Sequence, residues 1–320
     1  MFPSFILAIS AAVAGFGGGA AAAQLSASQV ATLTKFRQFA AVSRCDVVTI
    51  NGQWTCGPSC QGATAGTTVF KTFNGGDTGT GLVAVQPSSK SIVVIFRGSK
   101  TPADWFKNLN FGLDSASWLQ ASWAVPANLG NRLTGARLAI PSDLKIHSGF
   151  QEIYLGVRNT VQTAITDALA KNPGFSVNFV GHSLGGALAS FAAVDYLNLH
   201  GTSNAANTFI YTYGQPRAGN TAWANYFSSL PFASVSRVTR QQDIVPHLPP
   251  TSFSYRHTKQ EFGILADGSV VSCTNTGNAG EVSDCSNLNY NPLDIDFNLH
   301  TNGYFFTPAA IPFHRWGNKS

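Results

Sequence analysis

The stretch V-N-F-V-G-H-S-L-G-G-A, residues 177–187, constrains the fold of this chain more than any other. A short apolar run typical of a buried strand leads into G-H-S-L-G, and a pattern typical of a helix follows at 187–199. Glycine has no Cβ, so strand and helix can approach closely on either side of Ser183. The spacing predicts a sharp turn that projects Ser183 above a sheet.

Ser183 has two interpretations, a nucleophile or a serine in an ordinary turn. The motif by itself is weak evidence, because the chain has 31 glycines and turn serines often bond their own backbone. The flanking strand and helix favour the nucleophile. The helix would also direct its first N–H groups toward an oxyanion, and the N–H of Leu184 is the expected donor.

A serine nucleophile needs a histidine that takes its proton and an acid that orients the histidine. In chains with this turn the acid follows the serine and the histidine follows the acid. Asp243 is the best candidate acid, because it comes directly after an expected strand at 235–240. We expect Asp195, inside a helical pattern, to be solvated or capping. The other aspartates lie in polar loop sequence: Asp267, Asp284, Asp294 and Asp296.

Four histidines follow Asp243. His247 is close in sequence and has prolines on both sides, and His257 suits a packed or capping position. His300, in D-F-N-L-H-T-N-G-Y-F-F, is the favoured base, because a loop late in the chain can reach back over the sheet. On position alone, His314 remains an alternative.

Helical and strand patterns alternate along the chain, which predicts an α/β domain around a largely parallel sheet. Hydrophobic residues make up 44% of the 320 residues and charged ones 11%, so a large core is available. No repeat or linker divides the chain, and we predict one domain at 24–320. Helical spacing covers 29–39, 152–170 and 187–199, and strand-like runs cover 81–85, 92–96, 176–180, 209–213 and 235–240.

The first residues, MFPSFILAISAAVAGFGGGAAAAQ, combine an apolar run with small residues that suit signal peptidase. We predict a signal peptide at 1–23 and a secreted, extracellular protein. The apolar run is too short to span a membrane, and no later segment is long enough, so no transmembrane segment is expected. The net charge of +5 comes from scattered Lys and Arg, which argues against a nucleic-acid partner.

Five cysteines in a secreted chain predict disulfides. The pairs closest in sequence are the expected ones, Cys56 with Cys60 and Cys273 with Cys285. Cys45 is then left over, either free or paired between chains. A zinc site would need C-x-x-C doublets with matching histidines. The sequence lacks them, and no metal is expected.

Several motifs, taken in order, resemble one family: F-R-G-S from Phe96, H-S-G-F from His147, G-H-S-L-G-G from Gly181, Y-G-Q-P-R-A-G from Tyr213 and D-I-V-P-H-L-P-P from Asp243. From about residue 29 to 306 the chain is similar to the secreted filamentous-fungal triacylglycerol lipases, the class 3 lipases of the α/β-hydrolase fold. The resemblance implies a central, mostly parallel mixed sheet flanked by helices, with a short helical lid. It also implies feruloyl esterases as relatives.

The resemblance assigns roles to individual residues. Ser183, Asp243 and His300 take the positions of the catalytic triad. Ser99 joins Leu184 in the oxyanion hole, although Ser99 on its own would be interpreted as a polar loop residue.

The segment K-T-P-A-D-W-F-K-N-L-N, residues 100–110, predicts a short helix with Thr101 as its N-cap. Trp105, Phe106 and Leu109 would share one apolar face, and burying each is worth roughly 1.5–3 kcal/mol as an upper estimate. The resemblance implies that this helix is the lid over Ser183, opened where lipid offers its apolar face another place to be buried. The alternative is a helix packed permanently in the core.

The chain also departs from the family pattern. The usual bridge from a cysteine near Cys45 to the C-terminus is missing, because no cysteine follows Cys285. Arg44 stands where many members have tyrosine, and Glu261-Phe262 replaces the start of an E-Y-W motif. The tyrosine that commonly comes three residues after the catalytic histidine is four residues away, at Tyr304.

Together these features predict a carboxylic ester hydrolase that forms an acyl-enzyme and needs no cofactor. We predict a triacylglycerol lipase that acts as a peripheral monomer at a lipid–water interface, and Trp105 and Phe106 favour it over the alternatives. One alternative is a feruloyl or other soluble-ester esterase of the same family. The other is a non-catalytic lipid-binding protein on the same scaffold, against which an intact serine, acid and histidine set argues.

Overall fold

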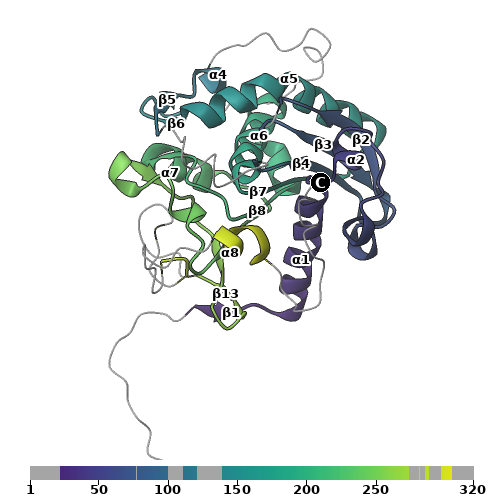
Figure 1. The fold of residues 1–320 in the computed structure, drawn as a ribbon. Coiled ribbons are helices and arrows are strands. Elements are labelled where there is room, and N and C mark those ends of the chain that lie inside the picture. The colour runs from purple at the N-terminus through teal and green to yellow at the C-terminus, as the bar shows by residue number, and fades with distance from the viewer. Residues whose placement is uncertain are drawn as a thin grey trace, which may run out of the picture.

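A mixed sheet forms the centre of the protein (Figure 1), whose computed structural model describes residues 22–76, 78–99, 111–120, 139–273, 281, 285–287 and 297–304. The strand order is β1-β13-β12-β10-β8-β7-β4-β3-β2. The inner strands β4, β7, β8, β10 and β12 are parallel neighbours, and the strands at both edges pair antiparallel. Their bounds are β1 Ala23–Gln24, β2 Thr68–Phe73, β3 Gly81–Gln86, β4 Ser91–Phe96, β7 Ser176–His182, β8 Thr208–Tyr213, β10 Ser234–Arg240, β12 Glu261–Ile264 and β13 Val270–Ser272.

Helices cover both faces of this sheet, and a smaller antiparallel sheet lies beside them. The small sheet has the order β11-β9-β6-β5, with β5 Leu113–Ser115, β6 Lys145–His147, β9 Gly219–Asn220 and β11 Tyr255–Arg256. The described helices are α1 Ala27–Val42, α2 Asp46–Thr49, α4 Ser117–Gln120, α5 Ser148–Lys171, α6 Leu184–His200, α7 Thr221–Ser229 and α8 Phe297–Asn302. None of the described helices is long and apolar enough to cross a membrane.

Strand β4 carries apolar residues on both of its faces. Val94 and Phe96 belong to the core cluster shared with α5 and α6. Val93 and Ile95 belong to the other cluster, which is shared with α1. In Figure 1, α1 accordingly lies on the opposite side of the sheet from α5 and α6. A strand buried on both faces carries apolar residues at every position instead of alternating with polar ones.

The predicted α/β-hydrolase architecture is confirmed. The helix predicted at 29–39 is α1, which begins after Ser26, where the side chains of Ser26 and Gln29 form a capping box. The helices predicted at 152–170 and 187–199 are α5 and α6, and α6 begins immediately after Ser183. The central strands lie where they were expected, within two residues at each end.

Asp195 was expected to be a solvated or capping carboxylate from its helical position, and this prediction is wrong. It is fully buried on α6, where it accepts hydrogen bonds from Arg158 at 2.7 and 2.8 Å and from the Tyr154 hydroxyl at 2.6 Å. Helix α6 is enclosed on all sides, so even its polar positions face neighbouring elements. The positive charge of Arg158 offsets the free-energy cost of burying the Asp195 carboxylate.

One of the two predicted disulfides is wrong. Cys45 bonds Cys56, with their Cα atoms 6.1 Å apart, and Cys60 is a buried free thiol. Cys60 ends the short turn Gly57–Cys60, and its side chain packs into the apolar cluster beside α1. The placement of the Cys60 side chain in this turn therefore decided the pairing, and closeness in sequence to Cys56 did not. The predicted bond between Cys273 and Cys285 is confirmed.

The pairing predicts how the thiols react. Burial raises the pKa of the Cys60 thiol, so little thiolate is present and we expect the native protein to react slowly with a thiol reagent. After unfolding without reductant, one thiol per chain should react, and non-reducing peptide mapping should place it at Cys60. Cys60→Ser should keep both disulfides. A cross-linked peptide that joins Cys56 to Cys60 would contradict the assignment.

Candidate active site

Ser183 lies at the junction of β7 and α6 in a backbone conformation that is unusual for serine. Its φ is 58° and its ψ is −135°. Such a conformation costs a non-glycine residue of order 1–3 kcal/mol and persists when the surroundings enforce it. Here the Ser183 N–H donates to the Tyr213 carbonyl at 2.8 Å, and its own carbonyl accepts from the Gly186 N–H at 2.9 Å. The strand and the helix therefore hold Ser183 in a strained elbow, as the motif predicted.

The motif glycines are required by close approach of the backbone. A Cβ on Gly181 would lie 2.1 Å from the Gly185 carbonyl oxygen. A Cβ on Gly185 would lie 2.3 Å from the Phe96 carbonyl oxygen at the end of β4. Neither position can hold a larger residue unless the backbone moves, so these glycines bring the end of β4 against the elbow.

This approach brings Ser99 to the elbow as well. Gly98 lies so close that a Cβ there would be 3.0 Å from the Ser183 Cβ and 2.7 Å from the His182 carbonyl oxygen. The Ser99 hydroxyl is buried and, within the described parts of the chain, accepts and donates no hydrogen bond. Leu184, the first residue of α6, follows Ser183 directly, with its N–H at the positive end of the helix.

Asp243 and His300 form a buried pair. Asp243 follows β10, and His300 lies on the short helix α8, so these residues come from distant parts of the chain. The His300 Nδ1 and the Asp243 Oδ2 are 2.9 Å apart, and both side chains are fully buried. The other carboxylate oxygen of Asp243 accepts from the Val245 N–H at 2.9 Å. The acid is therefore held at both oxygens and directs its histidine.

His300 lies close to the elbow. The His182 and His300 ring centroids are 4.6 Å apart, and His182 is the residue immediately before Ser183. On another side, a Cβ on Gly214 would lie 2.9 Å from the His300 ring. Gly214 follows Tyr213, whose carbonyl accepts the Ser183 N–H. The neighbours of Ser183 thus contact the His300 ring from two directions.

Tyr304, which stands out in the sequence only by its spacing from His300, contacts the Asp243 carboxylate. Its hydroxyl donates to the Asp243 Oδ2 at 2.5 Å, and its ring is buried. Burial raises the pKa of Tyr304, and the negative charge of Asp243 raises it further, so the hydroxyl keeps its proton. The chain turns after α8, where Arg240 binds the Gly303 carbonyl at 2.9 Å, and this turn brings Tyr304 back to the acid. An aromatic residue shortly after the candidate histidine was the available signal.

The alternative histidines are placed elsewhere. The His257 Nε2 lies 2.6 Å from the Pro246 carbonyl oxygen, and burial lowers the pKa of this ring well below its usual value. Burial, together with the charge of Arg217, lowers the pKa of His247 to about 4. His314 lies outside the described residues, as do Trp105, Phe106 and Leu109 of the predicted lid.

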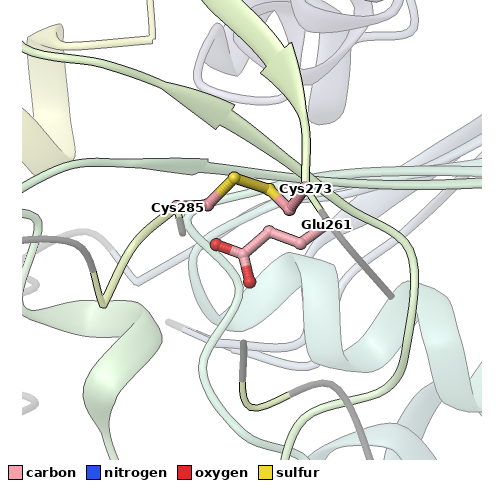
Figure 2. A group of neighbouring side chains, drawn as sticks. All are labelled: Glu261, Cys273 and Cys285. Carbon is pink, nitrogen blue, oxygen red and sulfur yellow. A yellow bond between two sulfur atoms is a disulfide. The ribbon is translucent and has the colours of Figure 1, made fainter. Parts of the chain in front are cut away.

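Glu261, Cys273 and Cys285 are one group of the described residues whose ligand atoms lie close enough to hold a metal ion (Figure 2). The two sulfur atoms are joined in a disulfide and so offer no thiolate. The chemistry of this donor set therefore does not fit a metal site.

The Glu261 carboxylate instead connects neighbouring segments. It accepts hydrogen bonds from the Thr239 hydroxyl at 2.6 Å, the Ser286 N–H at 3.0 Å and Arg237 at 2.9 Å. Burial alone would raise the pKa of Glu261, but the charge of Arg237 and these hydrogen bonds outweigh it and hold the pKa below its usual value. Glu261 thus fixes the segment after Cys285, through which the chain continues toward α8.

The chemistry available at the elbow is acyl transfer. A buried serine hydroxyl at a helix N-terminus, a histidine bonded to an acid and a second segment at the elbow are the parts that such a reaction needs. The Ser183 hydroxyl has no hydrogen-bond partner among the residues that the structure describes.

Comparison with known proteins points to one family. The family model described as Lipase (class 3) matches residues 93–253. A lipase of Rhizomucor miehei is 33% identical over 276 residues, which cover 84% of this chain and 67% of that protein. The secreted mono- and diacylglycerol lipase 1 of Fusarium solani is 34% identical over 252 residues, which cover 75% of this chain and 66% of that protein. This chain thus spans about two thirds of the length of these curated relatives.

Solved structures agree with these matches. The native propeptide complex of the Rhizomucor miehei lipase has a TM-score of 0.70 at 31% identity, covering 85% of this chain and 80% of that one. The lipase from Rhizopus microsporus var. chinensis has a TM-score of 0.70 at 28% identity, covering 83% and 84%.

The close approach at the elbow predicts that Gly185→Ala destabilises the protein. The new Cβ would collide with the backbone of β4, which cannot rotate away, and we expect a loss of about 3 kcal/mol in the free energy of unfolding. Gly156→Ala on α5 is the matched control, because a Cβ there meets nothing within 4 Å. It should stabilise the helix by up to about 1 kcal/mol. Equal denaturation midpoints for the two variants would contradict the steric argument.

The lowered pKa of Glu261 predicts acid sensitivity. The Glu261 carboxyl group binds a proton more readily in the unfolded state than in the folded state. The ionised Glu261 therefore stabilises the fold fully above the unfolded pKa of about 4.3, and this stabilisation is lost as pH falls through the folded pKa. Glu261→Gln should lower the free energy of unfolding at neutral pH by about 3–5 kcal/mol, because the buried ion pair between Arg237 and Glu261 is broken. Its stability should then decline less steeply below about pH 4 than that of the wild type.

Denaturant titrations over a pH series measure both effects. Glu152→Gln, at an exposed position on α5, is the control and should behave as the wild type does. Parallel acid curves for wild type and Glu261→Gln would show that another group is responsible.

Proposed function

Because the chain belongs to the class 3 lipases and is a carboxylic ester hydrolase, we propose that it is a secreted triacylglycerol lipase with Ser183, Asp243 and His300 as its catalytic triad. The observation that carries this proposal is the buried pair of Asp243 and His300, with Nδ1 and Oδ2 2.9 Å apart, beside a strained serine. The substrate is an acylglycerol, and the protein binds it at a lipid–water interface as a peripheral monomer.

The reaction starts with attack of the Ser183 Oγ on the ester carbonyl carbon. The His300 Nδ1–H donates to the Asp243 carboxylate, so the lone pair of the neutral ring is on Nε2, which takes the serine proton. Asp243 stabilises the imidazolium that results, and the hydroxyl of Tyr304 and the N–H of Val245 keep the acid in place. A tetrahedral intermediate forms with a negative charge on the former carbonyl oxygen.

The oxyanion is stabilised by the N–H groups of Leu184 and Ser99. Leu184 contributes the first N–H of α6, where the helix dipole favours negative charge. Ser99 lies beside the elbow because Gly98 packs against the His182 backbone and the Ser183 Cβ, and the Ser99 hydroxyl supplies a further donor. His300 then returns the proton to the departing alcohol and activates the water that hydrolyses the acyl-enzyme.

The preference for an interface depends on the predicted lid. Trp105, Phe106 and Leu109 provide an apolar face that lipid can bury in place of the protein. Secretion depends on the predicted signal peptide at 1–23.

A second candidate substrate is a partial glyceride. The relative from Fusarium solani, 34% identical to this chain, is named a secreted mono- and diacylglycerol lipase. Both candidates use the same elbow chemistry and differ in how many acyl chains the site admits.

One panel of assays tests the proposal. Wild type should hydrolyse tributyrin and triolein emulsion, with activity that rises when the substrate forms an interface. Ser183→Ala should lose more than about a thousandfold of that activity, because the covalent step is removed. Ser176→Ala, at the opposite end of β7, is the matched control and should keep it.

Substrate choice and labelling complete the panel. An organophosphonate should label wild type at Ser183 and leave Ser183→Ala unlabelled. Diolein hydrolysis without triolein hydrolysis would move the assignment to a partial glyceride lipase, and a preference for methyl ferulate would move it to an esterase. Full activity in Ser183→Ala would refute the triad.

A further inference from the structure

His182 carries a buried hydrogen-bond chain that the triad does not use. Its Nδ1 lies 3.2 Å from the Arg44 Nη2, and its Nε2 lies 2.8 Å from the His300 backbone carbonyl oxygen. Arg44 belongs to the turn after α1, where its N–H donates to the Ala41 carbonyl. Arg44 and His300 are separated from His182 by 138 and 118 residues in the sequence, and both contact this one ring.

The two contacts fix the proton position on the His182 ring. A guanidinium has N–H donors and no acceptor, so the His182 Nδ1 must present its lone pair to Arg44. The single proton of the neutral ring is then on Nε2, where it donates to the His300 carbonyl. The opposite tautomer would place a proton against a cation and a lone pair against a carbonyl oxygen.

The charges around His182 also keep the ring neutral. Burial lowers its pKa well below the usual value, and neighbouring His300, Arg44 and Arg37 lower it further, whereas the carbonyl of His300 acts in the opposite direction. His300 lies on α8, Arg37 on α1 and Arg44 after α1, and the Tyr304 ring meets His182 at 5.7 Å between centroids. Neutrality matters, because a His182 imidazolium 4.6 Å from the His300 ring would oppose the charge that His300 must take up in the reaction.

We propose that Arg44 and His182 are positioning residues for the proposed ester hydrolysis. Arg44 holds His182 in its neutral Nε2–H form, and that N–H holds the backbone of His300 above the elbow. The inference rests on the role of His300 under the proposed function. It also explains what arginine does where many family members have tyrosine. A tyrosine hydroxyl can donate or accept, so only the His300 carbonyl would then fix the tautomer, whereas arginine, which only donates, also keeps a proton off Nδ1.

The test combines kinetics with NMR of protein labelled with ¹⁵N-histidine. Long-range ¹H–¹⁵N correlations distinguish the two tautomers and the imidazolium. In the wild type we expect His182 to be neutral with its proton on Nε2 from about pH 8 down to about pH 5. In Arg44→Met we expect a proton to appear on Nδ1 toward the acid end of this range, because the guanidinium that contacts the Nδ1 lone pair is gone.

The kinetic consequence should follow the same titration. On tributyrin, Arg44→Met should lose roughly tenfold in kcat at the acid end, with KM unchanged, the order expected when one hydrogen bond that orients a catalytic group is lost. Arg44→Lys retains a donor and a charge and should restore both the kcat and the neutral ring. Arg37→Met is the matched control, because it removes a buried guanidinium of α1 and leaves the contact between Arg44 and His182 in place.

The outcomes separate this proposal from the proposed function. A wild-type His182 with its proton on Nδ1 would overturn the proposal whatever the activity is, as would Arg44→Met with unchanged kcat and an unchanged ring. An equal loss in Arg37→Met would also overturn it, because the effect would then be one of buried charge in general. If Arg44→Met does not fold, the wild-type NMR spectrum still tests the proposal, as do the kcat and the His182 spectrum of Arg44→Lys. If the protein hydrolyses no ester, the spectra still test the contact, and the failure belongs to the proposed function.

Discussion

The close contact between α6 and the ends of the central strands is the constraint on which the site depends. With Gly181 and Gly185 at the contact, the backbones meet at distances that no Cβ could occupy. The chain must therefore turn sharply between them, and Ser183 takes the strained conformation that this turn requires. The same contact draws the end of β4 and Ser99 to the elbow. The proposed nucleophile and the predicted oxyanion donors thus result from one packing requirement.

The partners of Ser183 are held by buried polar contacts rather than by a single rigid element. His300 lies on a helix of six residues, which is too short to define a position by itself. Its ring is fixed by Asp243, and its backbone carbonyl by His182. Asp243 is in turn bonded by Tyr304 and Val245. The Asp243 carboxylate and the His300 Nδ1 are paired in this way, which offsets the desolvation penalty that an isolated buried group would carry.

The departures from the family pattern lie in this support. Arg44 binds His182, and Tyr304, one residue later than the family pattern has it, binds Asp243. Glu261 is followed by Phe262 and Gly263, and a Cβ on Gly263 would lie 2.8 Å from the Cys285 sulfur. A larger residue at position 263 would therefore collide with the disulfide beside Glu261. Of these residues, Arg44 and Tyr304 contact the groups that hold His300.

The sequence by itself determined the elements whose cause is local. Periodic apolar residues fixed the helices and central strands, and the glycine spacing fixed the elbow, because these depend on backbone sterics and burial within a few residues. Order along the chain then ranked Asp243 and His300 as partners of Ser183. The tertiary structure alone decided the pairing of Cys45 with Cys56, the burial of Asp195 against Arg158, and the contacts of Tyr304 and Arg44. Some of those contacts join segments far apart in sequence, and others depend on where a side chain points. Neither property leaves a periodic pattern in a single sequence from which it could be predicted.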